Sequence, residues 1–327
     1  RGALMENTAI RPANPNASKE AAAVLEYLYG ISGKGIITGQ HTQTREQPEL
    51  DRILEVTGKL PALCGFELLA YSPNIDYVNS DEECLREVRE NEGTLGKALE
   101  WAEKRRGLVT FTWHWFSPIG GCGKSFYTER TGFDPEKALE AGTPENTALL
   151  SDMDHMAGLL KTFRDRRIPI LWRPFHESEG RWFWWGSKSH KTAAALYRLM
   201  FDRYTKLHGL DNLVWVWNSP VPEGYPGDDM VDVISRDVYL PGHVHTDYSK
   251  EYQELARVTG AGKPAALAEV GCLPDMETLA AARVPWCWYM TWSKGFCLSE
   301  EWNTCEQLRK TYHSDYAVTL DKLPVLY

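Results

Sequence analysis

Short apolar runs recur along the whole chain, and polar residues follow each of them. The runs are continuous and do not alternate with polar positions, which is typical of parallel strands buried on both faces. We therefore predict eight strands, at residues 35–41, 60–67, 108–115, 168–177, 212–218, 231–239, 264–271 and 286–293.

Amphipathic stretches lie between most of these runs. They predict helices at residues 16–30, 93–107, 146–167, 189–209 and 248–260. The first opens on Ser18 with nearby acids, a pattern typical of a capping box, and ends on Gly30. Regular alternation of strand and helix indicates a parallel sheet with right-handed crossovers. Eight strands in one series favour an α/β fold of the closed (β/α)8 type, a TIM barrel, over a doubly wound sheet.

Two segments depart from this alternation. Only about a dozen residues separate the fifth and sixth strands, which leaves little room for a helix. Residues 116–145 form a long, glycine-rich, polar segment, and such long loops are usually functional. Because we find no linker and no repeat, we predict a single catalytic domain over residues 1–327, with residues 1–15 as an N-terminal extension.

Charge and composition narrow the possible functions. A net charge of −9 without any basic block argues against nucleic-acid binding. No apolar run reaches the roughly 18 residues that cross a bilayer, so we expect no membrane insertion. The chain does not begin with Met and shows no signal peptide, which suggests a mature or trimmed form. The 7 cysteines include no CxxC pair, which argues against zinc, and Cys297 with Cys305 is a candidate disulfide.

Tryptophan is unusually abundant, with 13 residues, and several gather in the segment WRPFHESEGRWFWWG at 172–186. Large aromatic side chains often fill cores, and some of these must do so. Their mixture with ionisable side chains fits a carbohydrate site, because a sugar presents apolar C–H faces and polar hydroxyl edges.

The active site of such a barrel lies at the carboxyl ends of the strands. Most of the predicted ends carry an ionisable or aromatic residue: Gln40, His41, Glu67, His114, Trp115, His176, Glu177, Trp217, Asn218, Asp237, Tyr239, Glu269 and Trp292. Glu177 ends the fourth strand and Glu269 the seventh, so the two carboxyls should face each other across the mouth. Two facing carboxyls are the minimum equipment for glycoside hydrolysis, with retention or inversion decided by their separation.

Other interpretations of these residues remain open. A single strand-end Glu often only caps a helix or pairs with an Arg. His114 and His176 could bind a metal with Glu177 or Asp237, as in barrel metallohydrolases, although their spacing fits no local motif. A barrel that binds carbohydrate without cleaving it would also keep the tryptophans, but it should have lost one of the acids.

The segment at 172–186 resembles the acid/base segment of glycoside hydrolase family 26, whose best-known members are endo-β-1,4-mannanases. AEVG at the seventh strand is similar to the nucleophile strand of that family. The motifs GQH, TWHW, NLVWVWNS, YPGDDMVDVISRDVY and WYMTW fit around these two segments, so that the resemblance covers about residues 16–327.

The resemblance implies a retaining double displacement, with Glu177 as acid/base and Glu269 as nucleophile. It also implies the residues that surround the substrate and the nucleophile: His114, Trp115, Arg173, His176, Trp182, Asp237, Tyr239 and Trp292. His176 and Tyr239 match residues that hold the nucleophile, Trp292 the floor of the −1 sugar, and Trp182 the leaving-group side. The additional acid Glu179 departs from the family pattern, and it could bind a hydroxyl or face solvent.

We therefore expect an endo-β-1,4-mannanase that acts on mannan, glucomannan or galactomannan without cofactor or metal. The alternatives within the family are a β-1,3-xylanase, a mixed-linkage β-glucanase and a mannobiose-releasing exo-mannanase, since the motifs bear on catalysis and hardly on the sugar. A polysaccharide partner implies an extracellular, cell-surface or periplasmic location, and we expect a monomer.

Overall fold

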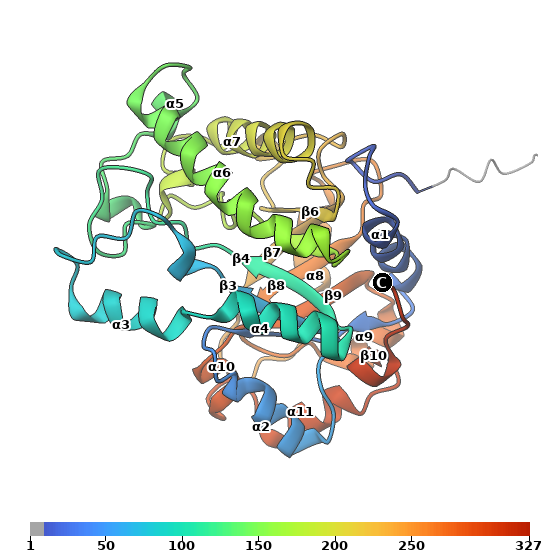
Figure 1. The fold of residues 1–327 in the computed structure, drawn as a ribbon. Helices are drawn as coiled ribbons and strands as arrows, with labels where there is room; N and C mark the ends of the chain where they lie inside the picture. Colours follow the sequence, from blue (N-terminus) through green and yellow to red (C-terminus); the bar gives the residue numbers. More distant parts are fainter. Residues whose placement is uncertain (1–9) are drawn as a thin grey trace, which may run out of the picture.

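Eight parallel strands form a closed barrel in the computed structural model, which describes residues 10–327 (Figure 1). The strands are β2 (Gly39–Thr42), β3 (Leu63–Glu67), β4 (Leu108–Thr112), β5 (Ile170–Trp172), β6 (Leu213–Asn218), β7 (Val233–Val238), β8 (Ala265–Val270) and β9 (Trp286–Thr291). β9 pairs with both β8 and β2, which closes the ring. The predicted (β/α)8 barrel is confirmed.

The first predicted strand, 35–41, is divided in two at Thr38. β1 (Ile36–Ile37) pairs with β9 and with β10 (Ala317–Val318), while β2 belongs to the barrel. The Thr38 hydroxyl donates to the carbonyl oxygen of Val318 at 2.9 Å and accepts from the amide of Ala62 at 3.2 Å. One apolar run therefore contains two short strands, because burial continues across the break.

Helices surround the barrel. They are α1 (Lys19–Ile31), α2 (Pro48–Thr57), α3 (Glu82–Asn91), α4 (Thr94–Glu100), α5 (Pro135–Ala138), α6 (Pro144–Asp165), α7 (His190–Asp202), α8 (Ser249–Ala256), α9 (Met276–Ala282), α10 (Gly295–Leu298) and α11 (Cys305–Tyr312). Wider π turns follow two of them, α4 and α7, so that the predicted helices 93–107 and 189–209 each end irregularly. Between β6 and β7 lies only the 3-10 turn Pro222–Gly224, as the short spacing predicted.

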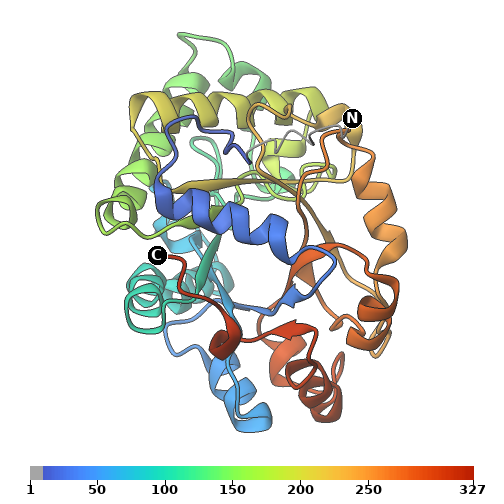
Figure 2. The same cartoon turned by 90° about the vertical axis from the view of Figure 1, so that its right-hand side faces the viewer.

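Helix α1 crosses one end of the barrel (Figure 2). Its apolar residues, including Val24 and Leu28, join the cluster formed by inward side chains such as Leu63 and Val214. Ser18 caps the helix by accepting from the amide of Ala21 at 3.1 Å. The position that an acid would occupy in a capping box is Ala21, so only half of the expected motif is present.

Two strands are shorter than predicted at the ends where we expected the site. The run 168–177 is extended only to Trp172, and 108–115 only to Thr112. Phe175 and Glu177 have φ angles of 56° and 52°, which an extended strand cannot accommodate. Glu177 therefore lies on the loop that follows β5 and not at the strand end.

Residues 1–9 of the predicted N-terminal extension lie outside the described residues. Within residues 10–15, the amide of Ala13 donates to Asp232 Oδ1 at 2.7 Å and Asn14 is buried.

All seven cysteines are unpaired, so the candidate disulfide between Cys297 and Cys305 is absent. In the described part of the chain, no helix combines the length and the apolar character needed to cross a membrane.

Candidate active site

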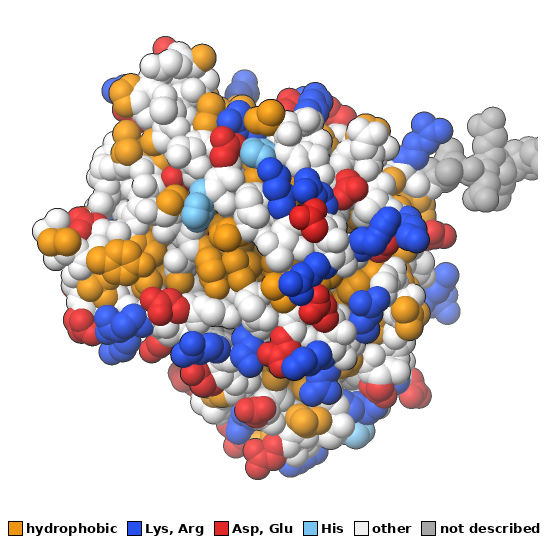
Figure 3. Space-filling view, in the orientation of Figure 1, with side chains coloured by type: hydrophobic (Ala, Val, Ile, Leu, Met, Phe, Trp, Pro, Cys, Tyr) orange, Lys and Arg blue, Asp and Glu red, His pale blue; other side chains and the backbone are white. Residues whose placement is uncertain are grey.

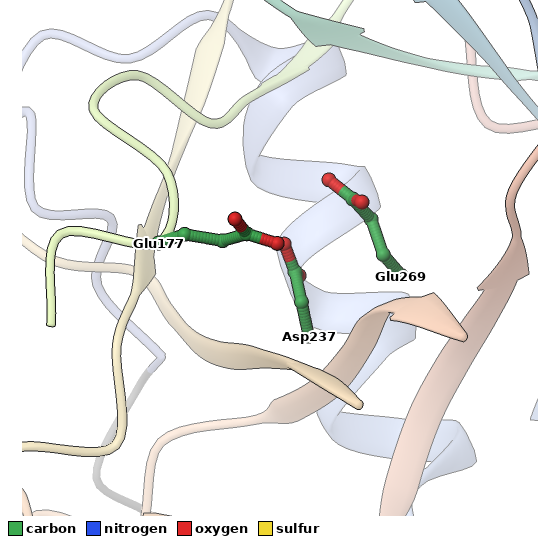
Figure 4. Close-up of side chains that lie close together, drawn as sticks. All are labelled: Glu177, Asp237 and Glu269. Atoms are coloured by element: carbon green, nitrogen blue, oxygen red, sulfur yellow. The ribbon is translucent and has the colours of Figure 1, made fainter. Parts of the chain in front are cut away.

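Three carboxylates converge at the carboxyl ends of the strands (Figure 4). Glu269 is in β8 and Asp237 in β7, paired in register, while Glu177 approaches from the loop after β5. One oxygen from each of the three lies within 4.8 Å of the other two. The barrel thus brings together the two acids that the sequence singled out, with a third beside them.

Arg173 binds two of these three acids. It comes directly after β5 and is only 1% exposed. Its guanidinium donates to Glu269 Oε2 at 2.6 Å, to Asp237 Oδ2 at 3.1 Å and to the Thr112 hydroxyl at 3.0 Å. Burial alone would lower the pKa of Arg173, but the two carboxylates raise it, so the side chain stays charged. A planar guanidinium suits such a double contact.

Glu269 accepts a second strong hydrogen bond from Tyr239, whose hydroxyl lies 2.7 Å from Oε1. Burial raises the pKa of Glu269, and the charge of Asp237 adds to this, whereas Arg173 and the Tyr239 hydroxyl act in the opposite direction. Tyr239 exposes 44% of its surface at the mouth although its hydroxyl points inward. Both oxygens of Glu269 are therefore held by donors.

Glu177 contacts an indole and another acid, and within residues 10–327 it has no cationic partner. Its amide donates to Asn218 Oδ1 at 2.7 Å, which fixes the loop, and its Oε2 accepts from the indole of Trp182 at 2.8 Å. Burial raises the pKa of Glu177 to about 8, with a further contribution from the charge of Asp237, while the Trp182 bond lowers it. This carboxyl consequently keeps its proton at neutral pH.

Aromatic rings form the floor beside the acids. The Trp292 ring stacks on His41, with ring centroids 3.7 Å apart and an angle of 8° between the planes. The His114 ring packs edge-on against the Trp292 ring, and its Nδ1 forms a hydrogen bond with Glu67 Oε2 at 2.8 Å. Burial would lower the pKa of His114, but Glu67 more than offsets it and the pKa is raised. His114 can therefore offer a proton on its other nitrogen to a ligand.

Three residues of this arrangement, His41, Glu67 and Asn218, were not among the selected site residues. Each lies at a predicted strand end, so the rule that active-site residues lie at the carboxyl ends of barrel strands already includes all three as candidates. What the sequence lacked was a reason to prefer them, because their importance comes from partners far along the chain: Trp292, His114 and Glu177.

Two predicted substrate contacts are not supported by position. Trp115 is only 2% exposed, stacks on Trp113 at 4.1 Å and donates to Asp152 at 2.8 Å, so it belongs to the packing beneath the site. His176 was expected to hold the nucleophile, but its Nδ1 is buried and has no hydrogen-bond partner within residues 10–327. Its ring packs against Phe183 and Trp185 instead.

Glu179, the unexpected acid, does not extend into solvent. Its Oε2 is buried without a hydrogen-bond partner among the described residues. Burial raises the pKa of Glu179 to about 7, Asp237 contributes in the same direction, and bonding to the Ser219 hydroxyl opposes them. The charge that departs from the family pattern is thus part of the acidic surroundings of Glu177.

The long segment 116–145 supports the loop that carries Trp182. The amide of Thr128 donates to the carbonyl of Trp182 at 2.7 Å, and that of Trp184 to the carbonyl of Phe126 at 3.1 Å. Tyr127 and Phe183 face each other in this antiparallel pair, with ring centroids 5.8 Å apart. Residues 126–128 of the segment therefore hold the loop that carries Trp182.

The geometry also bears on the metal interpretation. Among the described residues, the three carboxylates are the only cluster of potential ligands close enough to share an ion, and neither His114 nor His176 is part of it. The Arg173 guanidinium already provides a positive charge to two of the three. A divalent cation would be repelled there, so the residues present fit an Arg-compensated site better than a metal centre.

Charged side chains of both signs are mixed on the face of the molecule that Figure 3 shows. On the face shown in Figure 3, Lys and Arg side chains are interspersed with Asp and Glu, and no broad patch has a single sign. This agrees with the acidic net charge of −9.

Acids facing one another at the mouth of a (β/α)8 barrel, beside exposed and half-buried tryptophans, are the arrangement that glycoside hydrolases use. The model of the family described as "Glycosyl hydrolase family 26" matches residues 13–322. The chain belongs to this family.

Curated relatives agree with that assignment. The chain is 40% identical over 321 residues to a mannan endo-1,4-beta-mannosidase of Thermothelomyces thermophilus, covering 95% of this chain and 62% of the relative. It is 30% identical over 318 residues to mannan endo-1,4-beta-mannosidase A of a Piromyces species, covering 95% and 50%. The chain thus spans between half and two thirds of the length of these relatives.

Solved structures share the whole barrel. A Podospora anserina β-(1,4)-mannanase superimposes with a TM-score of 0.86 at 36% identity, covering 98% of this chain and 71% of that one. A β-mannanase from a symbiotic protist of the termite Reticulitermes speratus, complexed with gluco-manno-oligosaccharide, gives 0.84 at 30% identity and covers 96% and 97%.

Proposed function

We propose that this protein is a retaining endo-β-1,4-mannanase that cleaves internal bonds of mannan, glucomannan or galactomannan by double displacement. The observation that carries the proposal is the unequal pair Glu177 and Glu269, whose oxygens approach within 4.8 Å. Glu269 accepts hydrogen bonds from Arg173 and Tyr239, whereas Glu177 has a pKa of about 8.

The different environments of the two acids support different roles. Glu269 receives donors on both oxygens, an arrangement that favours its ionised form and suits a nucleophile. Glu177 faces Asp237 and has no cationic partner within residues 10–327, and burial raises its pKa to about 8, which suits the general acid. Formation of the glycosyl-enzyme would remove the charge of Glu269, after which Glu177 can act as a base towards water.

The substrate class follows from the family and the rings. Both curated relatives named above are mannan endo-1,4-beta-mannosidases, and both solved relatives are β-mannanases. Trp292 offers a stacking face beside Glu269, and Trp182, 48% exposed, offers another beside Glu177. We further propose that the chain forms one catalytic domain, acts as a monomer and works outside the cell, where polymeric mannan is found.

Cleavage of defined β-1,4-manno-oligosaccharides tests the substrate, with lichenan and β-1,3-xylan as controls. We expect turnover of the mannosides, with internal cleavage of the longer ones. Turnover of either control without turnover of the mannosides would indicate one of the other family activities. Release of mannobiose alone from every oligosaccharide would indicate exo action.

Glu269→Ala tests the catalytic pair on soluble mannan, with Glu277→Ala as control because Glu277 is exposed on α9. We expect Glu269→Ala to abolish release of reducing ends and Glu277→Ala to resemble the wild type. Unchanged release by Glu269→Ala would refute the pair. Binding of mannan by a wild-type protein that never cleaves it would indicate a carbohydrate-binding barrel, and activity lost to a chelator and restored by zinc would indicate a metal enzyme.

A further inference from the structure

Gly180 lies between the proposed acid and its tryptophan, and it has no room for a side chain. A Cβ built on Gly180 would meet three atoms of the Trp182 six-membered ring at 2.1, 2.2 and 2.4 Å. Cβ atoms do not approach ring carbons so closely, since carbon pairs pack at about 3.5–4.0 Å. The indole of Trp182 therefore lies directly on the Gly180 backbone.

The Gly180 backbone has little freedom to move away. Its amide donates to the carbonyl of Glu177 at 3.1 Å. On the other side, a Cβ on Gly186 would meet the Gly180 carbonyl oxygen at 2.2 Å, so the two backbones are in direct contact. Any side chain at position 180 would consequently displace the indole and not the loop.

The Trp182 backbone is also fixed, by the amide of Thr128 on its carbonyl at 2.7 Å. Because the backbone is held, the only easy relief of a clash is rotation of the half-exposed ring away from the loop. That rotation would break the 2.8 Å bond from the indole nitrogen to Glu177 Oε2.

We propose that Gly180 is a positioning residue for catalysis: its missing side chain lets the Trp182 indole lie flat on the loop and donate to Glu177. This inference rests on the proposed role of Glu177 as the acid/base. Gly180 itself touches no substrate and acts only through Trp182.

The pH profile of kcat/KM for manno-oligosaccharides gives a readout that packing alone would not change. Burial raises the pKa of Glu177 and the Trp182 bond lowers it, so losing the bond should raise it further. The acid then holds its proton to higher pH, and the alkaline limb should move upward. We expect Gly180→Ala and Trp182→Phe, which keeps an aromatic ring without the N–H, to show upward shifts of similar size.

The double variant G180A/W182F tests whether the two residues act through one bond. If they do, Gly180→Ala should add no shift in the Trp182→Phe background. Gly158→Ala on α6 is the matched control, because a Cβ there meets no described atom within 4 Å. A wild-type profile for Gly180→Ala, or full additivity with Trp182→Phe, would overturn the proposal.

Two further variants separate the possible failures. If Gly180→Ala does not fold, G180A/W182A should fold as well as Trp182→Ala, because the clashing ring is gone; failure of the double variant alone would refute the inference. Glu177→Gln, measured in parallel, should lack the alkaline limb. If Glu177→Gln keeps the alkaline limb, Glu177 is not the acid. If Glu177→Gln loses the limb but the Gly180→Ala profile is unshifted, only the proposed role of Gly180 is refuted.

Discussion

At the scale of single residues, the site depends on how one positive charge is distributed among three acids. Arg173 lies on Asp237 and Glu269, whereas the Glu177 carboxyl accepts from the Trp182 indole and faces Asp237. Two carboxyls of the same residue type thereby acquire different properties. Their identities could be predicted from strand-end position, but the division of the charge could not, because it depends on distances of a few ångströms.

The proton on Glu177 should set the alkaline limit of activity. Its pKa of about 8 lies above the ordinary value, so it stays protonated through neutral pH and kcat/KM should fall as the pH rises through about 8. Glu177→Gln should lower kcat/KM on mannan by about 10²–10⁴-fold, the usual contribution of a general acid. For an aryl mannoside whose leaving group needs no proton, formation of the glycosyl-enzyme should be much less affected. Equal losses on both substrates would contradict the acid role.

Removing Arg173 should destabilise the folded protein, because two buried carboxylates lose their positively charged partner. Arg173→Met leaves Asp237 and Glu269 buried without a cation, which should lower the free energy of unfolding by about 3–5 kcal/mol at pH 7. The deficit should shrink as the pH falls, because protonation neutralises the uncompensated carboxyls. Urea unfolding at pH 7 and pH 5 measures both effects.

The control for that experiment is Arg166→Met, since Arg166 is half exposed and pairs with Glu103 at the surface. Such pairs contribute about 0–1 kcal/mol, so this variant should be close to the wild type at both pH values. A loss for Arg173→Met no larger than for Arg166→Met would mean that water compensates the two acids.

At the scale of elements, the loops decide where the site residues lie. The strand pattern predicted the barrel well, because each run of buried residues corresponds to a real strand. It failed at 173–177, where Pro174, Phe175 and His176 are as buried as a strand but the backbone turns through positive φ. Burial alone does not distinguish a packed loop from a strand, so Glu177 was placed correctly in space but on the wrong element.

Trp115 was placed at a strand end for the same reason: it is buried, although β4 ends at Thr112. Its contact with α6 allows a test of how that helix is attached to the barrel. Asp152 of α6 accepts from Trp115 at 2.8 Å and from Asn74 at 2.7 Å. Asp152→Ala leaves the buried Trp115 indole N–H without its partner, at about 1–3 kcal/mol, and the half-buried Asn74 amide also loses its acceptor. We therefore expect a loss of at least about 1 kcal/mol in chemical denaturation. Ser151→Ala, exposed on the same helix, should change stability little, and an equally small effect for Asp152→Ala would show that the two donors find other partners.

At the scale of the whole molecule, barrel closure brings residues of distant segments to one mouth. Glu67, Glu177, Asp237 and Glu269 come from four separate strand–helix units. Their convergence could be predicted from topology, because strand ends of a parallel barrel share one rim. Which of them touch could not, since that depends on side-chain packing such as Trp292 on His41.

The stereochemistry of the reaction should report on the geometry of that rim. Retaining glycosidases keep their two carboxyls about 5–5.5 Å apart, and inverting ones about 6.5–9.5 Å, to leave room for water. One oxygen of Glu177 and one of Glu269 lie within 4.8 Å of each other, which favours the shorter, retaining separation. Proton NMR of mannopentaose cleavage should therefore show the β-anomer of the new reducing end first, with the α-anomer growing in by mutarotation. Initial appearance of the α-anomer would require the acids to move apart on binding substrate, and would refute a direct attack by Glu269.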